Sequence, residues 1–183
     1  MSSVTAPTPA QDTGADALRL RFREAMANLP AAVNIVTTAG PAGRCGITAT
    51  AVCSVSDTPP TLLFCINRNS TTLPAFEQNR QLCINVLPAE CDELARHFAG
   101  MSGLSMEERF QAANWSADGG AAPRLEQALV SLLGRVVEVT QVGTHAIIFA
   151  QIDDIAIRQQ ADALVYFDRT FRRVTRQAEV QPA

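Results

Sequence analysis

Apolar residues recur first at helical spacing and then in short, strand-like runs. Leu18, Phe22, Met26 and Leu29 lie three to four residues apart with arginines between them, which predicts an amphipathic helix that Pro30 ends. Further along, runs rich in β-branched residues are separated by Gly, Pro and polar turns, which predicts a series of strands. The predicted strands are 32–38, 44–56, 61–66, 82–87, 132–139, 144–152 and 164–169.

The middle of the chain predicts additional helices. One covers 90–99, and another is opened by Ser105 and Glu108, which have the spacing of a capping box. No Gly-x-Gly-x-x-Gly follows a strand and strands do not alternate steadily with helices, so a Rossmann domain is not expected. Short strands separated by turn signals instead favour a mainly β, single-domain antiparallel barrel with flanking helices.

The two ends of the chain differ in composition from the domain between them. Residues 1–15 are rich in Pro, Ser, Thr and Ala, so they are expected to form a disordered tail, as are residues 175–183. The folded domain is expected over 16–174. The first segment lacks the basic and apolar regions of a secretory leader, and no apolar run approaches the length of a bilayer span. A cytoplasmic protein without membrane association is therefore expected.

Composition excludes several functional classes. Of 183 residues, 47% are hydrophobic and 18% charged, and the net charge of −3 gives no basic footprint for nucleic acid. An odd number of cysteines without Cys-x-x-Cys spacing argues against a disulfide framework and against a zinc site. They are interpreted as small hydrophobes in a reducing compartment, with a reactive thiol as the alternative. The cysteines are Cys45, Cys53, Cys65, Cys83 and Cys91.

Residues 44–56 carry small side chains where a core strand normally has Leu, Ile or Phe. Small residues allow another backbone or a flat ligand to approach, and Thr and Ser add hydroxyl groups without filling the space. Two interpretations therefore remain open from composition. The segment is either a strand packed tightly beneath a helix or the floor of a binding surface.

The polar loop 67–72 follows a predicted buried strand and precedes Pro74, which fits the first turn of a helix. Ser70, Thr71 or Thr72 could cap that helix. Hydroxyl and amide groups at such a position also suit a bound anion. An ordinary N-cap is the simpler interpretation from the residues alone.

The sequence offers little acid–base machinery of its own. His97 and His145 are the only histidines, and neither a Gly-x-Ser-x-Gly elbow nor a carboxylate pair in an apolar setting is present. A hydrolase is therefore disfavoured. A small-residue floor, a candidate phosphate loop and one histidine after a Gly turn are typical of proteins whose cofactor supplies the chemistry.

The motif Arg-Cys-Gly-Ile-Thr-Ala-Thr-Ala-Val-Cys-Ser-Val-Ser-Asp-Thr-Pro-Pro at 44–60 resembles the short-chain flavin reductases, which have an FMN-binding split barrel. The similarity extends over about 18–171 and looks strongest to the reductase components of 4-hydroxyphenylacetate 3-monooxygenases. Other matching segments are 20–26, 32–38, 65–70, 95–101, 106–110 and Gly143-Thr144-His145.

This resemblance implies a homodimeric enzyme that uses NADH, or alternatively NADPH, to reduce FMN or FAD. The reduced flavin would diffuse to a large oxygenase component. The residues implied to line the flavin ring are Thr48, Ala49, Thr50 and Ala51. Those implied to hold the ribityl chain and phosphate are Ser54, Asn67, Asn69, Ser70 and Thr72. His145 would lie by the nicotinamide, with Tyr166 and Arg169 as wall residues.

Two departures from the family pattern affect cofactor preference. Arg172 stands where a histidine is expected, and residues 114–130 match loosely. Two alternative functions also remain. One is a flavin- or haem-binding split-barrel protein that does not turn over, and the other is a reductase that serves an oxygenase with a different substrate.

Overall fold

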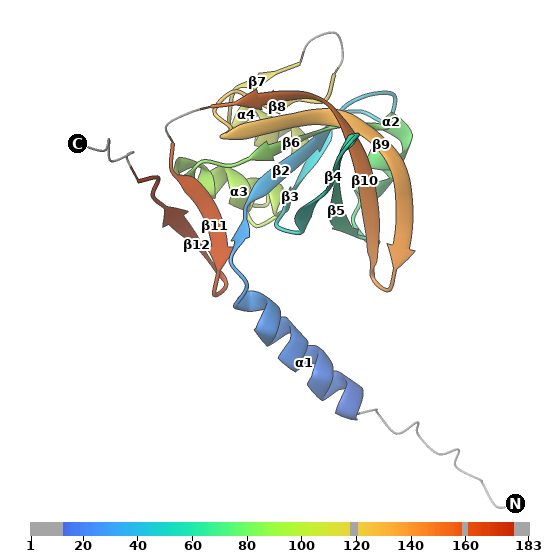
Figure 1. Ribbon diagram of the computed structural model, residues 1–183, viewed down its shortest axis with the longest axis vertical. Coiled ribbons are helices and arrows are strands. Elements are labelled where there is room, and N and C mark those ends of the chain that lie inside the picture. The colour runs from blue at the N-terminus through green and yellow to red at the C-terminus, as the bar shows by residue number, and fades with distance from the viewer. Residues whose placement is uncertain (1–12, 118–120, 159–160, 178–183) are drawn as a thin grey trace, which may run out of the picture.

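A computed structural model describes residues 13–117, 121–158 and 161–177 of the chain (Figure 1). Its largest unit is a seven-stranded sheet in the order β3-β2-β6-β9-β10-β5-β4, and every pairing in it is antiparallel. These strands are β2 (Asn34–Thr38), β3 (Cys45–Ala49), β4 (Val52–Asp57), β5 (Pro60–Asn67), β6 (Gln81–Val86), β9 (Val130–Val142) and β10 (His145–Ile157). The predicted mainly β, antiparallel fold is confirmed.

Smaller elements flank this sheet. A three-stranded sheet joins β1 (Ala31–Ala32), β11 (Ala163–Phe167) and β12 (Thr170–Val174), and a two-stranded one joins β7 (Trp115–Ser116) to β8 (Arg124–Leu125). The helices are α1 (Thr13–Ala27), α2 (Leu73–Asn79), α3 (Asp92–Phe98) and α4 (Met106–Gln111), with a 3₁₀ turn at Ala89–Cys91. None of the helices in the described parts is long and apolar enough to cross a membrane.

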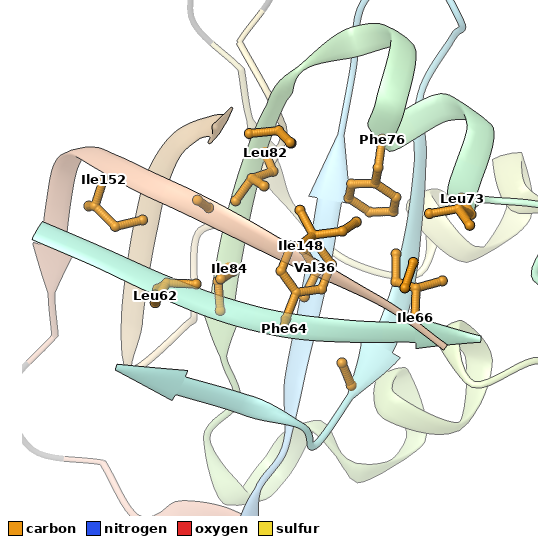
Figure 2. Packing of buried hydrophobic residues seen from close by; sticks show 14 residues of the cluster. Val36, Leu62, Phe64, Ile66, Leu73, Phe76, Leu82, Ile84, Ile148 and Ile152 are labelled. Atoms are coloured by element: carbon orange, nitrogen blue, oxygen red, sulfur yellow. The ribbon is translucent and has the colours of Figure 1, made fainter. Parts of the chain in front are cut away.

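The main core lies inside the curled sheet. Phe64 of β5 meets Phe76 of α2 edge to face, with ring centroids 5.7 Å apart, and Ile148 of β10 packs beside them (Figure 2). Period-2 alternation places every second residue of β5, and of β10 as far as Ile152, in this core, which is the pattern of a strand with one buried face. This packing holds β5 and α2, and therefore the loop between them, in a fixed position.

A second cluster packs α3 and α4 together and against the sheet at β2 and β3. Phe98, Phe110 and Trp115 contact one another with ring centroids 5.1–5.5 Å apart. The capping box predicted at Ser105 is confirmed, because its hydroxyl accepts from the Glu108 N–H while the Glu108 side chain accepts from the Ser105 N–H. The aromatic cluster thus fixes both helices over β3.

Three strand predictions differ from the structure. The predicted strand 164–169 ends at Phe167, because Asp168 and Arg169 have positive φ and form the turn into β12. The predicted strand 44–56 is interrupted, since β3 ends at Ala49 and β4 begins at Val52. The predicted strand 144–152 continues to Ile157, so Asp153 and Asp154 lie within β10 rather than at its end. Each carboxylate there forms an ion pair, with Arg135 and Arg124 respectively, which offsets the poor strand propensity of aspartate.

The helix predicted at 18–29 begins earlier, because α1 starts at Thr13. Residues 13–15, predicted to belong to a disordered tail, are therefore helical. The rest of that predicted tail, 1–12, lies outside the described residues, as do 178–183 of the C-terminal tail. Figure 1 shows α1 projecting away from the sheets, and its apolar side chains are exposed, with Leu18 at 66% and Phe22 at 60%.

Candidate functional site

A cleft with a volume of about 690 Å³ borders β3. One wall comes from the end of β5 and the loop before α2, together with His145 of β10. The other wall comes from the segment that joins α3 to α4. Its lining residues are Gly46–Ala51, Cys65–Asn67, Ser70–Thr72, Phe98–Gly100, Leu104–Met106, Arg109 and His145.

Both interpretations of the small-residue segment describe part of what β3 does. Thr48 donates its hydroxyl hydrogen to the carbonyl oxygen of Ala95 at 2.7 Å, which ties the strand to α3. A Cβ added at Gly46 would come within 2.9 Å of the Phe98 ring, so this position needs glycine for helix packing. The same segment lines the cleft, so it is both a tightly packed strand and a surface open to a ligand.

The break between β3 and β4 places two residues outside the strand ladder. Thr50 and Ala51 are exposed and line the cleft, whereas Ala49 is only 7% exposed and belongs to the main core. A backbone released from strand pairing can offer its N–H groups to a bound molecule. The flat, accessible part of the floor is therefore at Thr50 and Ala51.

The loop 67–72 presents hydroxyl and amide groups to the cleft. The side-chain oxygen of Asn67 accepts from the N–H of Asn69 at 2.9 Å, and the hydroxyls of Ser70 and Thr72 lie 2.8 Å apart. Thr72 occupies the N-cap position of α2, but its side chain makes no capping bond, so the predicted side-chain cap is wrong. The hydroxyls bond each other because Thr72 has helical backbone angles, which point its side chain away from the capping position.

His145 begins β10 directly after the two-residue turn at Gly143 and Thr144. It pairs with Asn67 across the sheet, which places it next to the polar loop. Its Nδ1 lies 2.9 Å from the Thr144 hydroxyl, and this hydrogen bond orients the ring. The imidazole is exposed and lines the cleft, so its other nitrogen can meet a ligand.

Cys65 also lines the cleft, diagonally across the strand pair from His145. No hydrogen bond joins the two side chains, and burial raises the pKa of the Cys65 thiol. A thiol that stays protonated is a weak nucleophile, so these two residues do not make a Cys–His catalytic pair. What the cleft can do chemically is position flat rings and phosphate groups.

The structure brings together eight of the twelve predicted site residues at the cleft and leaves four outside its lining. Ser54 is exposed on β4, and Asn69 is exposed in the polar loop. Tyr166 packs on Phe171, and Arg169 forms an ion pair with Glu24 of α1 at 2.5 Å. The residues at the cleft are Thr48, Ala49, Thr50, Ala51, Asn67, Ser70, Thr72 and His145.

Sequence reasoning assigned no role to the wall between α3 and α4. Phe98–Gly100, Leu104–Met106 and Arg109 all line the cleft. Their sequence contains motifs typical of helix ends, but no spacing rule indicates that these residues face β3. The contact becomes visible only after α3 and α4 have packed on the sheet.

Comparison with known proteins agrees with this geometry. Residues 26–175 match the family model described as a flavin reductase like domain. The 4-hydroxyphenylacetate 3-monooxygenase reductase component of Pseudomonas aeruginosa is 54% identical over 153 residues, covering 84% of this chain and 90% of that protein. The FMN reductase (NADH) RutF of Escherichia coli is 50% identical, covering 86% of this chain and 94% of that protein.

A solved structure shows the same architecture. The flavin reductase HpaC complexed with NADP+ superposes with a TM-score of 0.76 at 25% identity, covering 85% of this chain and 97% of that one. The family match over most of the chain, the curated relatives and the shared fold lead to one conclusion: this protein belongs to the flavin reductase family, with its split-barrel fold.

Proposed function

We propose that this chain is an NAD(P)H-dependent flavin reductase that releases reduced flavin to a separate oxygenase. The observation that carries the proposal is the composition of the cleft. Its accessible floor is Thr50 and Ala51, one wall offers hydroxyls and amides, and His145 stands beside that wall. Such a cleft can hold two rings at contact distance, which is the main requirement of a direct hydride transfer.

The residues of the cleft fit a flavin. Exposed small side chains at Thr50 and Ala51 leave space for the flat isoalloxazine. Their carbonyl oxygens accept from Val52 and Cys65, and their backbone N–H groups can donate to the polar edge of the ring. The hydroxyls of Ser70 and Thr72 suit a phosphate, because their hydrogens can rotate toward its oxygens. The flavin, when bound, supplies the chemistry by accepting a hydride from the reduced nicotinamide.

The protein's own part is orientation. Thr48 holds β3 against α3, so the floor does not move away from the opposite wall. His145, oriented by Thr144, would lie beside the nicotinamide. Neither role requires His145 to exchange a proton. Ser54, Asn69, Tyr166 and Arg169 complete the set of flavin residues in this proposal, and the two on the β11–β12 hairpin would act from a partner subunit.

FMN or FAD is the flavin, and NADH is the expected donor, with NADPH as the alternative. Support comes from the relatives, one named for FMN and NADH and another solved with NADP+. The oxygenase partner is expected to be a 4-hydroxyphenylacetate 3-monooxygenase, as the name of the Pseudomonas relative states for that protein. That reaction would place the chain in aromatic catabolism.

A homodimer is supported by the exposed apolar side chains of helix α1. Leu18, Leu20 and Phe22 of this helix are each at least 59% exposed. Such a surface is stabilised when a second subunit covers it. Sedimentation should then give twice the 19.6 kDa of one chain. A reducing, cytoplasmic location is supported by the five free cysteines.

The experiment that tests the function follows NADH absorbance after FMN, FAD or riboflavin is added in excess to the flavin-free protein. Oxidation of NADH that scales with added flavin is expected, and the ranking of the three gives the preferred flavin. Reduced flavin must then support hydroxylation of 4-hydroxyphenylacetate when the oxygenase is in a separate dialysis compartment. A protein that binds flavin but leaves NADH unchanged would instead be a flavin-binding protein without turnover.

A further inference from the structure

Arg109 is the one arginine in the lining of the cleft, and the proposed flavin site does not use it. It lies on α4, which forms the wall opposite the polar loop before α2. Figure 1 shows α2 on one side of β3 and the helices α3 and α4 on the other. Arg109 and the hydroxyls of Ser70 and Thr72 therefore line the cleft from different elements.

The charge of Arg109 is not neutralised by its neighbours. Glu107 forms an ion pair with Arg44 at 2.7 Å, and the Glu108 carboxylate accepts from Ser105. Across the described residues, no carboxylate lies within 4 Å of the Arg109 guanidinium. A positive charge without a partner in a ligand cleft attracts an anion.

The guanidinium is also held in place. Its Nε–H donates to the carbonyl oxygen of Leu104 at 3.0 Å, and the side chain is half-buried. This bond uses one of the five N–H donors and leaves both Nη groups available. A fixed guanidinium fork with two free amino groups matches the paired oxygens of a phosphate group.

We propose that Arg109 binds the pyrophosphate of the nicotinamide dinucleotide, so that the hydride donor lies between β3 and the α3–α4 wall. This inference rests on the proposed flavin reductase function. The ligand chemistry is a pyrophosphate attached to adenosine, which FAD also contains, so the test uses FMN as the acceptor. With FMN present, NADH is the only ligand that carries a pyrophosphate.

The decisive comparison uses two hydride donors with Arg109→Gln. With NADH, the KM should rise about tenfold to a hundredfold, the loss expected for hydrogen bonds to a charged group, while kcat changes less than about twofold. With N-benzyl-1,4-dihydronicotinamide, which has no phosphate, the rate should not change. Arg176→Gln, which removes an exposed arginine outside the cleft lining, should leave both rates unchanged.

A binding measurement gives a readout that does not depend on turnover. Calorimetry of NAD+ with the FMN-saturated protein should show a Kd raised about tenfold or more by Arg109→Gln, with FMN affinity unchanged. Arg109→Lys keeps the charge but not the guanidinium fork, so its Kd for NAD+ should lie between those of the wild type and Arg109→Gln. If Arg109→Gln does not fold, Arg109→Lys carries the test with the same two donors: its KM for NADH should rise while its rate with the benzyl donor stays unchanged.

Several results would overturn the assignment. An unchanged Kd for NAD+, or an equal loss with the benzyl donor, would show that Arg109 does not bind the dinucleotide. A raised Kd for FMN would assign it to the flavin phosphate, and one raised for FAD alone would assign it to the adenylate of FAD. Failure of the proposed function would give a different result. The wild-type protein would then not oxidise NADH, although its binding of NAD+ would still depend on Arg109.

Discussion

The hydroxyl of Thr48 donates to the carbonyl oxygen of Ala95 at 2.7 Å, and this bond joins the floor of the cleft to the helix that begins its far wall. The bond is half-buried and acts between segments 47 residues apart in sequence. The binding of any ligand between the two walls therefore depends on the Thr48–Ala95 hydrogen bond, because this bond fixes the distance between the walls. This relationship gives the first prediction.

Thr48→Val should lower the free energy of unfolding by about 1 kcal/mol, because the hydrogen bond from residue 48 to α3 is lost while the side-chain volume is kept. The Ala95 carbonyl keeps the Ala99 N–H as a donor. Flavin affinity should also fall as the walls become less fixed. Thr48→Ser, which retains the hydroxyl, is the control. The measurements are urea denaturation and flavin fluorescence titration. A valine variant with wild-type stability would show that the bond is not needed.

Ala51→Leu should abolish flavin binding and leave the melting temperature nearly unchanged. Ala51 is exposed and lines the cleft, so the larger side chain occupies ligand space without entering the core. Ala49→Leu is the informative comparison, because Ala49 is 7% exposed within the main core and should lose about 1–3 kcal/mol of stability from overpacking. Normal flavin affinity in folded Ala51→Leu would show that the flavin does not bind over Ala51.

His145→Ala should raise the KM for NADH, or lower kcat, by about tenfold, the scale of one positioning hydrogen bond. Flavin affinity should change much less, because the histidine lies beside the polar loop rather than on the floor. Steady-state kinetics and a separate flavin titration distinguish the two effects. Thr144→Val, which removes only the group bonded to Nδ1, should give a smaller loss in the same direction. Unchanged kinetics would exclude a role for His145.

Cys65 should react slowly with iodoacetamide near pH 8, because burial raises its pKa and keeps the thiol protonated. As pH rises toward that higher pKa, the thiolate fraction and the rate should rise. Saturating FMN should slow the reaction further, since Cys65 lines the cleft. Exposed Cys53 outside the cleft is the internal control, followed by mass spectrometry of the same sample. Equal modification of Cys65 with and without FMN would contradict its position.

Asn85 should be among the most sensitive positions for stability, although it is far from the proposed chemistry. Its buried amide donates to Ile35 at 3.1 Å and accepts from the Leu125 N–H at 2.8 Å and the Ser131 hydroxyl at 3.2 Å. Asn85→Ala leaves these groups unpaired and should cost about 3 kcal/mol in urea denaturation. Asn69→Ala, at an exposed asparagine, should change stability by less than about 0.5 kcal/mol.

Local patterns predicted most elements because their signals lie within a few residues. The turn at 39–43 and the strands on either side form the predicted hairpin, with Ile35 opposite Thr48. The capping box at Ser105 needs only its own turn of helix, and it is present. Predictions at the ends of elements were less accurate. The break after Ala49 and the extension of β10 through Asp153 depend on neighbouring strands and on ion pairs with distant arginines.

The sequence by itself determined the antiparallel β class and the family, because periodicity and motifs are local properties. It also identified two segments that border the cleft, the small-residue segment 44–56 and the polar loop 67–72. Only the tertiary structure decided which residues share a surface. Because β3 ends at Ala49, that residue is buried while Thr50 and Ala51 are exposed. The tertiary structure also brought Arg109 of α4 and Ser70 of the polar loop to the same cleft. That arrangement arises from α3 and α4 packing on β3 through Phe98 and Phe110, a contact between distant segments that no sequence spacing encodes.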